Sequence, residues 1–247
     1  MLRRTFSTLT HSTHSRHLST SSQPLVFRTA EAYAGWRSSV EGSVGFVPTM
    51  GALHEGHLSL VDRVKAEVGD GKVVASVFVN PSQFAPTDDL DAYPRQLEED
   101  VEALGERGVD VVFAPDEKEM YPEGFCSWVE VDFEGGDVGE GGARPGFFRG
   151  VATVVTKLLH IVRPTVAGFG AKDAQQVMVI RQLLKDLNFE VQLVVGETVR
   201  EADGLAMSSR NAYLSAEERK EAPSLYEGLR EIAKRSEDAA ELLSPEE

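Results

Sequence analysis

Short apolar runs alternate along this chain with segments in which apolar residues recur every three or four positions. The runs at 43–48 (SVGFVP) and 72–80 (KVVASVFVN) are rich in β-branched residues and lack polar alternation. This is typical of strands that are covered on both faces. Between the two runs, Leu60, Val61, Val64 and Val68 recur with His57 at the spacing of one helix face. The pattern therefore predicts a strand, a loop, a helix and a second strand.

The alternation continues as far as residue 195. We expect helices at 95–107, 151–162 and 173–187, strands at 109–115, 165–170 and 189–195, and a charged helical segment after 223. The three prolines of 80–94 and the seven glycines of 132–150 predict two loops. Strands that alternate with helices predict an α/β fold, with a mainly parallel sheet and helices on both faces.

The first 24 residues differ in composition from the rest of the chain. They contain Arg3, Arg4 and Arg16, many Ser and Thr residues, and no acidic residue occurs before Glu31. This composition is similar to that of a mitochondrial transit peptide, so we expect a mitochondrial location. The alternative is a disordered Ser/Thr-rich N-terminus in a cytoplasmic protein.

Charge and cysteine content exclude several classes of function. Residues 25–247 carry 22 basic and 40 acidic side chains, and such a surface repels nucleic acid. No apolar run is long enough for a membrane-spanning helix, so we expect no membrane partner. The single cysteine, Cys126, forms neither an internal disulfide nor a cysteine metal site.

The loop PTMGALHEGH (48–57) offers the clearest candidate site. Gly56 lets the backbone approach a ligand closely, and the free amides of the following helix favour an anion. His54 and His57 add side-chain donors. We rank phosphate binding above a paired-histidine metal site, which lacks a third ligand. A structural turn with incidental histidines remains an alternative.

Three further polar segments follow predicted strands, and the carboxyl ends of parallel strands share one edge of a sheet. Asn80 and Gln83 of NPSQF suit a hydroxylated small molecule, although a plain Asn-Pro turn would look the same. In GFGAKDAQQ, Lys172 supplies a cation, and Asp173 either caps a helix or accepts from a ribose hydroxyl.

The segment MSSRN offers hydroxyl and guanidinium donors from Ser208, Ser209 and Arg210, which suit phosphate oxygens. ARPGFFRG adds Arg144 and Arg149 in the glycine-rich loop, where each could equally be a solvated arginine.

Taken together, PTMGALHEGH, VFVNPSQF, DAYPR, RPGFFRGV, FGAKDAQQ and DGLAMSSRN closely resemble the pantothenate synthetase (pantoate–β-alanine ligase) family, in this order and spacing. The resemblance implies a Rossmann-like ATP- and pantoate-binding domain at 25–198 and a smaller C-terminal lid domain that begins at 199. Because members of the family continue some tens of residues further, 199–247 is expected to hold only the start of that lid. The closed site and the homodimer would both depend on the missing part.

The resemblance also implies a two-step reaction. The pantoate carboxylate attacks the α-phosphorus of ATP, giving pantoyl adenylate and diphosphate, and the amine of β-alanine then displaces AMP to give pantothenate. Other adenylyltransferases of the same HxGH superfamily, and a nucleotide-binding module without turnover, are the alternative functions.

Roles for individual residues follow from the resemblance alone. His54 is the expected catalytic acid, and Lys172 neutralises charge on the transferring phosphate. The expected catalytic residues are His54, His57, Lys172, Ser208, Ser209 and Arg210. The expected ATP-binding residues are these six with Pro48, Thr49, Met50, Gly51, Gly170, Asp173, Val199 and Met207. The expected pantoate-binding residues are Gln83, Gln176, Asn80, Tyr93 and Arg144, and Asp100 and Glu99 match the region that binds Mg²⁺.

Two positions depart from the family pattern. Ala171 stands where the family usually has Glu, and Phe147 stands where a His is common.

Overall fold

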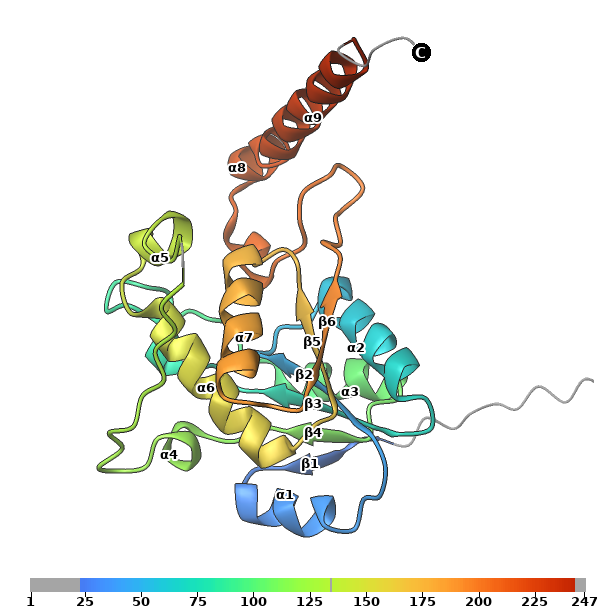
Figure 1. Ribbon diagram of the computed structural model, residues 1–247, viewed down its shortest axis with the longest axis vertical. Helices are drawn as coiled ribbons and strands as arrows, with labels where there is room; N and C mark the ends of the chain where they lie inside the picture. The colour runs from blue at the N-terminus through green and yellow to red at the C-terminus, as the bar shows by residue number, and fades with distance from the viewer. Residues whose placement is uncertain (1–22, 134, 243–247) are drawn as a thin grey trace, which may run out of the picture.

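The computed structural model describes residues 23–133 and 135–242, and a six-stranded sheet lies at its centre (Figure 1). The strands are β1 (Leu25–Phe27), β2 (Val44–Thr49), β3 (Lys72–Val77), β4 (Val111–Phe113), β5 (Val166–Gly170) and β6 (Gln192–Gly196). Their order is β1-β4-β3-β2-β5-β6, and each neighbouring pair is parallel. The predicted α/β class, with a parallel Rossmann-like sheet, is confirmed.

Helices cover both faces of the sheet. The longer ones beside it are α1 (Ala30–Arg37), α2 (Glu55–Val68), α3 (Leu97–Glu106), α6 (Phe147–Val162) and α7 (Ala174–Asp186). Figure 1 shows α6 and α7 on one face, with α2 and α3 on the other. Successive residues of a strand point to opposite faces. Accordingly, Phe46 of β2 packs in the core under α6 and α7, and Val47 packs in the core under α2.

The pattern did not predict β1 and α1, which precede the first expected strand. β1 is only three residues long, and its Leu25 and Val26 are 53% and 41% exposed. The one buried residue of α1 is Tyr33, which packs against Phe113 of β4. An edge strand with exposed apolar residues and a helix with a single buried side chain carry little periodic signal.

The loop predicted at 132–150 is wrong at two places. A short helix, α5 (Gly139–Ala143), lies inside it, and α6 begins at Phe147 rather than at Val151. The sequence pattern did not predict these two helical segments because they contain several glycines, and glycine has a low intrinsic helix propensity. Elsewhere, the short elements η1 (Pro81–Gln83) and α4 (Glu117–Met120) lie in segments without a predicted helix.

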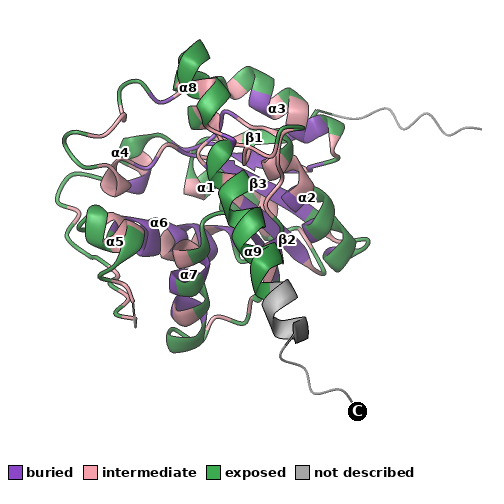
Figure 2. Cartoon of the chain, turned by 90° about the horizontal axis from the view of Figure 1, so that it is seen from above, coloured by how far each residue is buried: buried purple, intermediate pink, exposed green. Residues whose placement is uncertain are grey.

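The chain leaves the sheet after β6. It forms η2 (Ser209–Tyr213), α8 (Ala216–Glu221) and α9 (Ser224–Leu242). Figure 1 shows α9 directed away from the sheet, and Figure 2 shows this helix as mostly exposed over residues 224–236, in contrast with the buried strands. Within the described residues, none of the helices combines the length and apolarity that a membrane crossing requires.

The strand order reverses direction at β2. From β2 the chain adds β3 and β4 on one side, and later adds β5 and β6 on the other. The loops that follow β2 and β5 therefore diverge and leave a crevice at the carboxyl ends of these strands. This is the place where open α/β sheets bind their ligands.

Candidate functional site

Two small cavities adjoin at this crevice. The first, which we call the amide cavity, has a volume of about 150 Å³, and the second, the histidine cavity, about 110 Å³. The walls of both include Pro48, His57, Phe169, Asp173 and Gln176. Ligands in the two cavities would therefore lie against one another.

Most of the predicted site residues line one cavity or the other. Those of the amide cavity are Pro48, Thr49, Met50, His57, Asn80, Gln83, Tyr93, Asp173 and Gln176. Those of the histidine cavity are Pro48, His54, His57, Gly170, Lys172, Asp173, Gln176, Val199 and Met207. The remaining predicted residues, Gly51, Glu99, Asp100, Arg144, Ser208, Ser209 and Arg210, line neither cavity.

The two histidines are built into the start of α2. His54 is the N-cap residue, and its Nδ1 accepts from the amide of Gly56 at 3.1 Å. His57 reaches back, so that its Nδ1 accepts from the amide of His54 at 3.4 Å. Since an amide N–H can only donate, each Nδ1 is the unprotonated nitrogen and each Nε2 carries the proton. Both rings therefore offer N–H donors at Nε2.

Gly56 is required by this arrangement rather than by its backbone angles. A Cβ at this position would lie 2.9 Å from the His54 ring atoms Cε1 and Nδ1. Any other residue would push the ring away from the amide that it caps. The glycine of HEGH therefore fixes the orientation of His54.

Burial keeps both histidines neutral near pH 7. It lowers the pKa of His57 to about 3, with smaller contributions from His54 and Lys172. Burial, followed by the charge of Lys172, also lowers the pKa of His54. In this setting the rings are neutral hydrogen-bond donors. The acid role expected for His54 would need a nearby negative charge, which raises the pKa of a histidine.

Lys172 supplies the positive charge of the histidine cavity. Its Nζ lies 3.2 Å from Oδ1 of Asp173, and its side chain is 38% exposed. Asp173 is the N-cap residue of α7 but makes no side-chain capping bond. Neutral donors and one cation thus face the same small space, together with the carboxylates of Asp173 and Glu197. The neutral donors and the cation suit a phosphate.

The amide cavity has a different chemistry. Asn80 and Gln83 provide amides, whereas much of the remaining wall is apolar: Phe78, Val151, Val154, Val155, Leu158 and Phe169. Sequence reasoning missed this wall, because the spacing of the valines on α6 predicts core packing. A cavity with amide donors and an apolar wall suits a small molecule that carries both hydroxyl and methyl groups.

Asp100 has a structural role that the predicted Mg²⁺ site did not anticipate. Its side chain is 1% exposed, and its two oxygens accept from the amides of Ala52 at 2.9 Å and Leu53 at 2.8 Å. These bonds hold the turn at Gly51, which has φ +86° and where a Cβ would lie 2.7 Å from Oδ2 of Asp100. Gly51 thus belongs to the turn.

The neighbouring acids do not complete a metal site. Glu99 is an exposed residue in the first turn of α3. Among the described residues, there is no cluster of three or more His, Cys, Asp or Glu side chains that could hold a metal ion. The residues present therefore do not fit the expected Mg²⁺ ligands, and we assign Asp100 to the turn.

The segment 208–210 contacts the site from outside. Ser209 Oγ donates to the carbonyl of Ala52 at 2.9 Å, and Ser208 Oγ caps η2 by accepting from the amide of Arg210. Arg210 forms a two-pronged ion pair with Asp89 at 3.0 and 2.9 Å. The three residues of the expected phosphate clamp thus line neither cavity, and an aspartate that sequence reasoning missed holds the guanidinium of Arg210.

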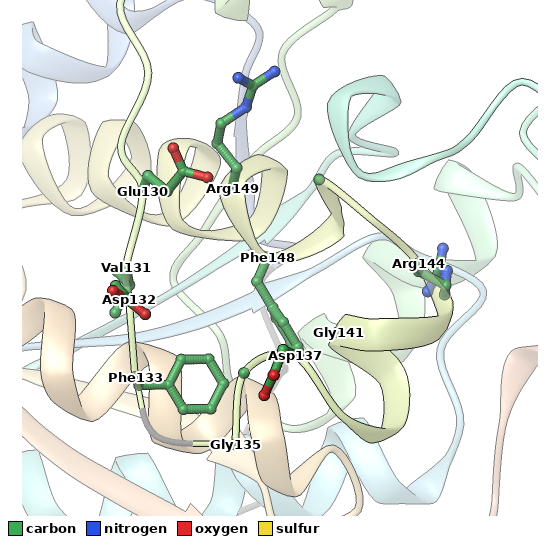
Figure 3. Close-up of a pocket in the computed structure, with 12 residues that line it drawn as sticks. Glu130, Val131, Asp132, Phe133, Gly135, Asp137, Gly141, Arg144, Phe148 and Arg149 are labelled. Atoms are coloured by element: carbon green, nitrogen blue, oxygen red, sulfur yellow. The ribbon is translucent and has the colours of Figure 1, made fainter.

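Arg144 is also held by carboxylates. It pairs with Asp88 at 2.8 Å and Glu140 at 2.9 Å, and it donates to the carbonyl of Gln83 at 3.1 Å. It lines a larger cavity of about 890 Å³, formed by residues of 130–133 and 135–149 (Figure 3). In Figure 3, Phe133 and Phe148 point into this space. Arg144 thus lines neither the amide cavity nor the histidine cavity, and its contact with pantoate stays a prediction.

Comparison with known proteins identifies the family. The family model described as "Pantoate-beta-alanine ligase" matches residues 25–246. The chain belongs to the pantoate–β-alanine ligase family. A pantothenate synthetase of Herpetosiphon aurantiacus is 57% identical over 186 residues, which are 75% of this chain and 66% of that protein. The chain thus spans just under two thirds of the length of this ligase.

Solved structures of the ligase family have the same fold. Pantothenate synthetase of Thermus thermophilus aligns with a TM-score of 0.81 at 51% identity, over 86% of this chain and 76% of that one. A ligase of Francisella tularensis, described as complexed with "Beta-gamma ATP and Beta-alanine", gives 0.80 at 42% identity, over 84% and 79%. The resemblance inferred from the six motifs is confirmed.

The two departures from the ligase pattern lie in different surroundings. The ring of Phe147 lies under the guanidinium of Arg144, whose Cζ is 4.0 Å from the ring centroid. Ala171 is exposed, and its amide donates to the carbonyl of Gly196 at 2.8 Å, which joins the ends of β5 and β6. Phe147 therefore supports an arginine by a cation–π contact.

Proposed function

We propose that this protein catalyses the ATP-dependent condensation of pantoate with β-alanine to pantothenate, through pantoyl adenylate. The observation that supports the proposal is the shared wall of the two cavities. A cavity with the histidine donors and the Lys172 ammonium, beside an amide-lined, partly apolar one, would bring the α-phosphate of ATP against the carboxylate of pantoate. Joining two bound reactants in this way can lower the barrier by about 7–11 kcal/mol.

In the proposed first step, a carboxylate oxygen of pantoate forms a bond to the α-phosphorus, and the bond from that phosphorus to diphosphate breaks. The Nε2–H groups of His54 and His57 and the ammonium of Lys172 donate to phosphate oxygens that gain charge. Gln83, Gln176 and Asn80 orient pantoate. In the second step, the amine of β-alanine attacks the acyl carbon, loses a proton, and AMP leaves.

Four further assignments belong to this proposal. Residues 199–247 belong to a lid domain, with Ser208, Ser209 and Arg210 contacting phosphates. Mg²⁺ accompanies ATP as a counter-ion of its phosphates, with no protein ligand assigned. The protein forms a homodimer, and light scattering, which measures its mass in solution, tests this assignment.

Residues 1–24 direct the protein to mitochondria. Most of this leader lies outside the described residues, and fusion of 1–24 to a fluorescent protein tests its targeting.

The reaction is tested by two assays on the purified chain. We expect pantoate-dependent exchange of labelled diphosphate into ATP, and release of AMP only after β-alanine is added. An adenylyltransferase acting on a phosphorylated acceptor would give no free AMP, and a module without turnover would give neither signal. Absence of both signals from a well-folded sample would refute the proposal.

A pair of substitutions separates the chemistry of His54 from its capping role. His54→Ala removes the ring and the cap, which costs about 1 kcal/mol of stability. His54→Asn keeps a side-chain acceptor for the amide of Gly56 but lacks the Nε2–H donor. We expect both variants to lose at least about 100-fold in exchange rate, and only His54→Ala to be less stable. Full activity in His54→Asn would remove His54 from the mechanism.

A further inference from the structure

A chain of hydrogen bonds at the wall of the amide cavity fixes the side chain of Asn80. Its Nδ2 donates to the carbonyl of Gly150 at 3.2 Å, and its Oδ1 accepts from the amide of Ser82 at 3.4 Å and from Ser82 Oγ at 2.9 Å. A carbonyl can only accept and an amide N–H can only donate. The orientation of the Asn80 amide, which is 1% exposed, is therefore unambiguous.

The orientation of Asn80 determines that of Gln83. Asn80 Nδ2 also donates to Gln83 Oε1 at 3.0 Å, so the oxygen of Gln83 is turned away from a ligand and toward Asn80. Gln83 Nε2 then lies 3.1 Å from the sulfur of Met50, and both residues line the amide cavity. One N–H of Gln83 Nε2 donates to this sulfur, so its second N–H is left as the donor for a carboxylate or hydroxyl oxygen.

Tyr121 holds the far end of this chain. Its hydroxyl donates to Asn80 Oδ1 at 2.7 Å, the shortest of the bonds to that oxygen. Tyr121 follows α4 and lines neither cavity. Its ring packs edge-on against Phe125 at 5.0 Å. Burial raises the pKa of the Tyr121 hydroxyl, which keeps it protonated as a donor.

We propose that Tyr121 is a positioning residue that, through Asn80, sets Gln83 as a hydrogen-bond donor to the carboxylate-bearing, hydroxylated substrate. This inference rests on the proposed function, because pantoate is the molecule assigned to the amide cavity. A donor at Asn80 Oδ1 stabilises the only amide orientation in which Nδ2 faces Gln83. Without the Tyr121 hydroxyl, Asn80 Oδ1 keeps only the two longer bonds from Ser82, so the orientation that turns the oxygen of Gln83 away from the substrate is less strongly favoured.

The matched test compares Tyr121→Phe with Tyr33→Phe. Tyr33 is buried, whereas Tyr121 is half-buried, and the Tyr33 hydroxyl donates to the carbonyl of Val162 at 3.2 Å, away from both cavities. Both variants lose one hydroxyl that donates a hydrogen bond within the protein, and both keep the ring. A general loss of stability would therefore affect the two alike, whereas a positioning role would affect only Tyr121→Phe.

For Tyr121→Phe we expect the KM for pantoate, and the Kd for pantoate measured by calorimetry, to rise about three- to tenfold, a factor that one hydrogen bond accounts for. The KM for ATP and the kcat at saturating pantoate should stay within about twofold. Tyr33→Phe should change none of these constants. Addition of Ser82→Ala to Tyr121→Phe should raise the pantoate constants further.

The outcomes separate the inference from the proposed function. Unchanged pantoate constants in Tyr121→Phe, or an equal rise in the KM for ATP, would overturn the positioning role while leaving the ligase activity intact. If the wild type binds pantoate without turnover, the proposed reaction fails, and the calorimetric comparison still decides the role of Tyr121. Absence of pantoate binding in the wild type would overturn both.

Discussion

Asp100 offers a prediction in which two interpretations lead to opposite results. If it holds the turn at 51–53, its loss should lower the stability of the fold. If it binds Mg²⁺, its loss should leave stability unchanged and raise the Mg²⁺ requirement. Asp100→Asn is the informative change, because it keeps the shape of the side chain and replaces one oxygen by an NH₂ group.

The expected magnitude follows from the two bonds to Ala52 and Leu53. In Asp100→Asn, one of these buried amides loses its acceptor and faces another donor, which costs about 1–3 kcal/mol. The substitution also removes a buried charge, and burial already raises the pKa of Asp100 despite the two bonds. Removal of that penalty offsets part of the loss. We therefore expect a net loss of about 1–2 kcal/mol, and about twice as much for Asp100→Ala, which orphans both amides.

The assay is denaturant unfolding at pH 7, with Glu99→Gln as the control on the same helix. Glu99 is exposed, so its substitution should stay within about 0.5 kcal/mol. The m-value should not change in either variant. Because the folded pKa of Asp100 is raised above its usual 3.8, the stability that it contributes is greatest below that pH. This contribution is lost as pH rises through the raised value, and Asp100→Asn should abolish that dependence. An Asp100→Asn protein as stable as Glu99→Gln, with an increased Mg²⁺ requirement, would refute the reasoning.

Three other predictions test the loop and its contacts. The folded pKa of His57 is about 3 against 6.5 for an ordinary histidine, so its contribution to stability is present above pH 6.5 and is lost as pH falls toward 3. His57→Gln should remove up to about 1.4 kcal/mol per pH unit from the slope of unfolding free energy in that range, and an unchanged slope would contradict the assigned burial. Gly56→Ala should lower the diphosphate exchange rate by at least about tenfold by displacing His54; normal exchange would show that the ring tolerates the shift. Ser209→Ala should lower the unfolding free energy by about 1 kcal/mol through loss of the bond to Ala52, whereas unchanged stability with lost ATP binding would place that hydroxyl on a phosphate.

The sequence predicted the main strands and the residues at their ends because both depend on local patterns. Buried parallel strands are continuous apolar runs, and loops such as PTMGALHEGH follow them directly. The local pattern did not predict β1, because this segment is a strand only through its pairing with β4, with Leu25 opposite Val111. Helix α5 and the start of α6 were not predicted, because tertiary packing outweighs the low helix propensity of glycine there.

Within the site, the sequence identified which residues gather but not what holds them. Asp89 and Asp88 were parts of a predicted loop, and nothing in a loop sequence states that they pair with Arg210 and Arg144. The role of Asp100 depends on a contact with a turn 48 residues earlier. Such partners become visible only when the chain is folded.

The strand order also bears on how the molecule reaches its native state. One edge of β2 pairs with β3, which follows soon after it in the chain. The other edge pairs with β5, with Gly45 opposite Val166, and β5 comes much later in the chain. Contacts between residues so distant in sequence form slowly, and domains are made from the N-terminus onward. During synthesis, the edge of the central strand therefore stays open until more than a hundred further residues have emerged. The histidines are made early, but the crevice that they line is completed only when β5 docks, so substrates that bridge the two loops can bind and stabilise only the finished fold.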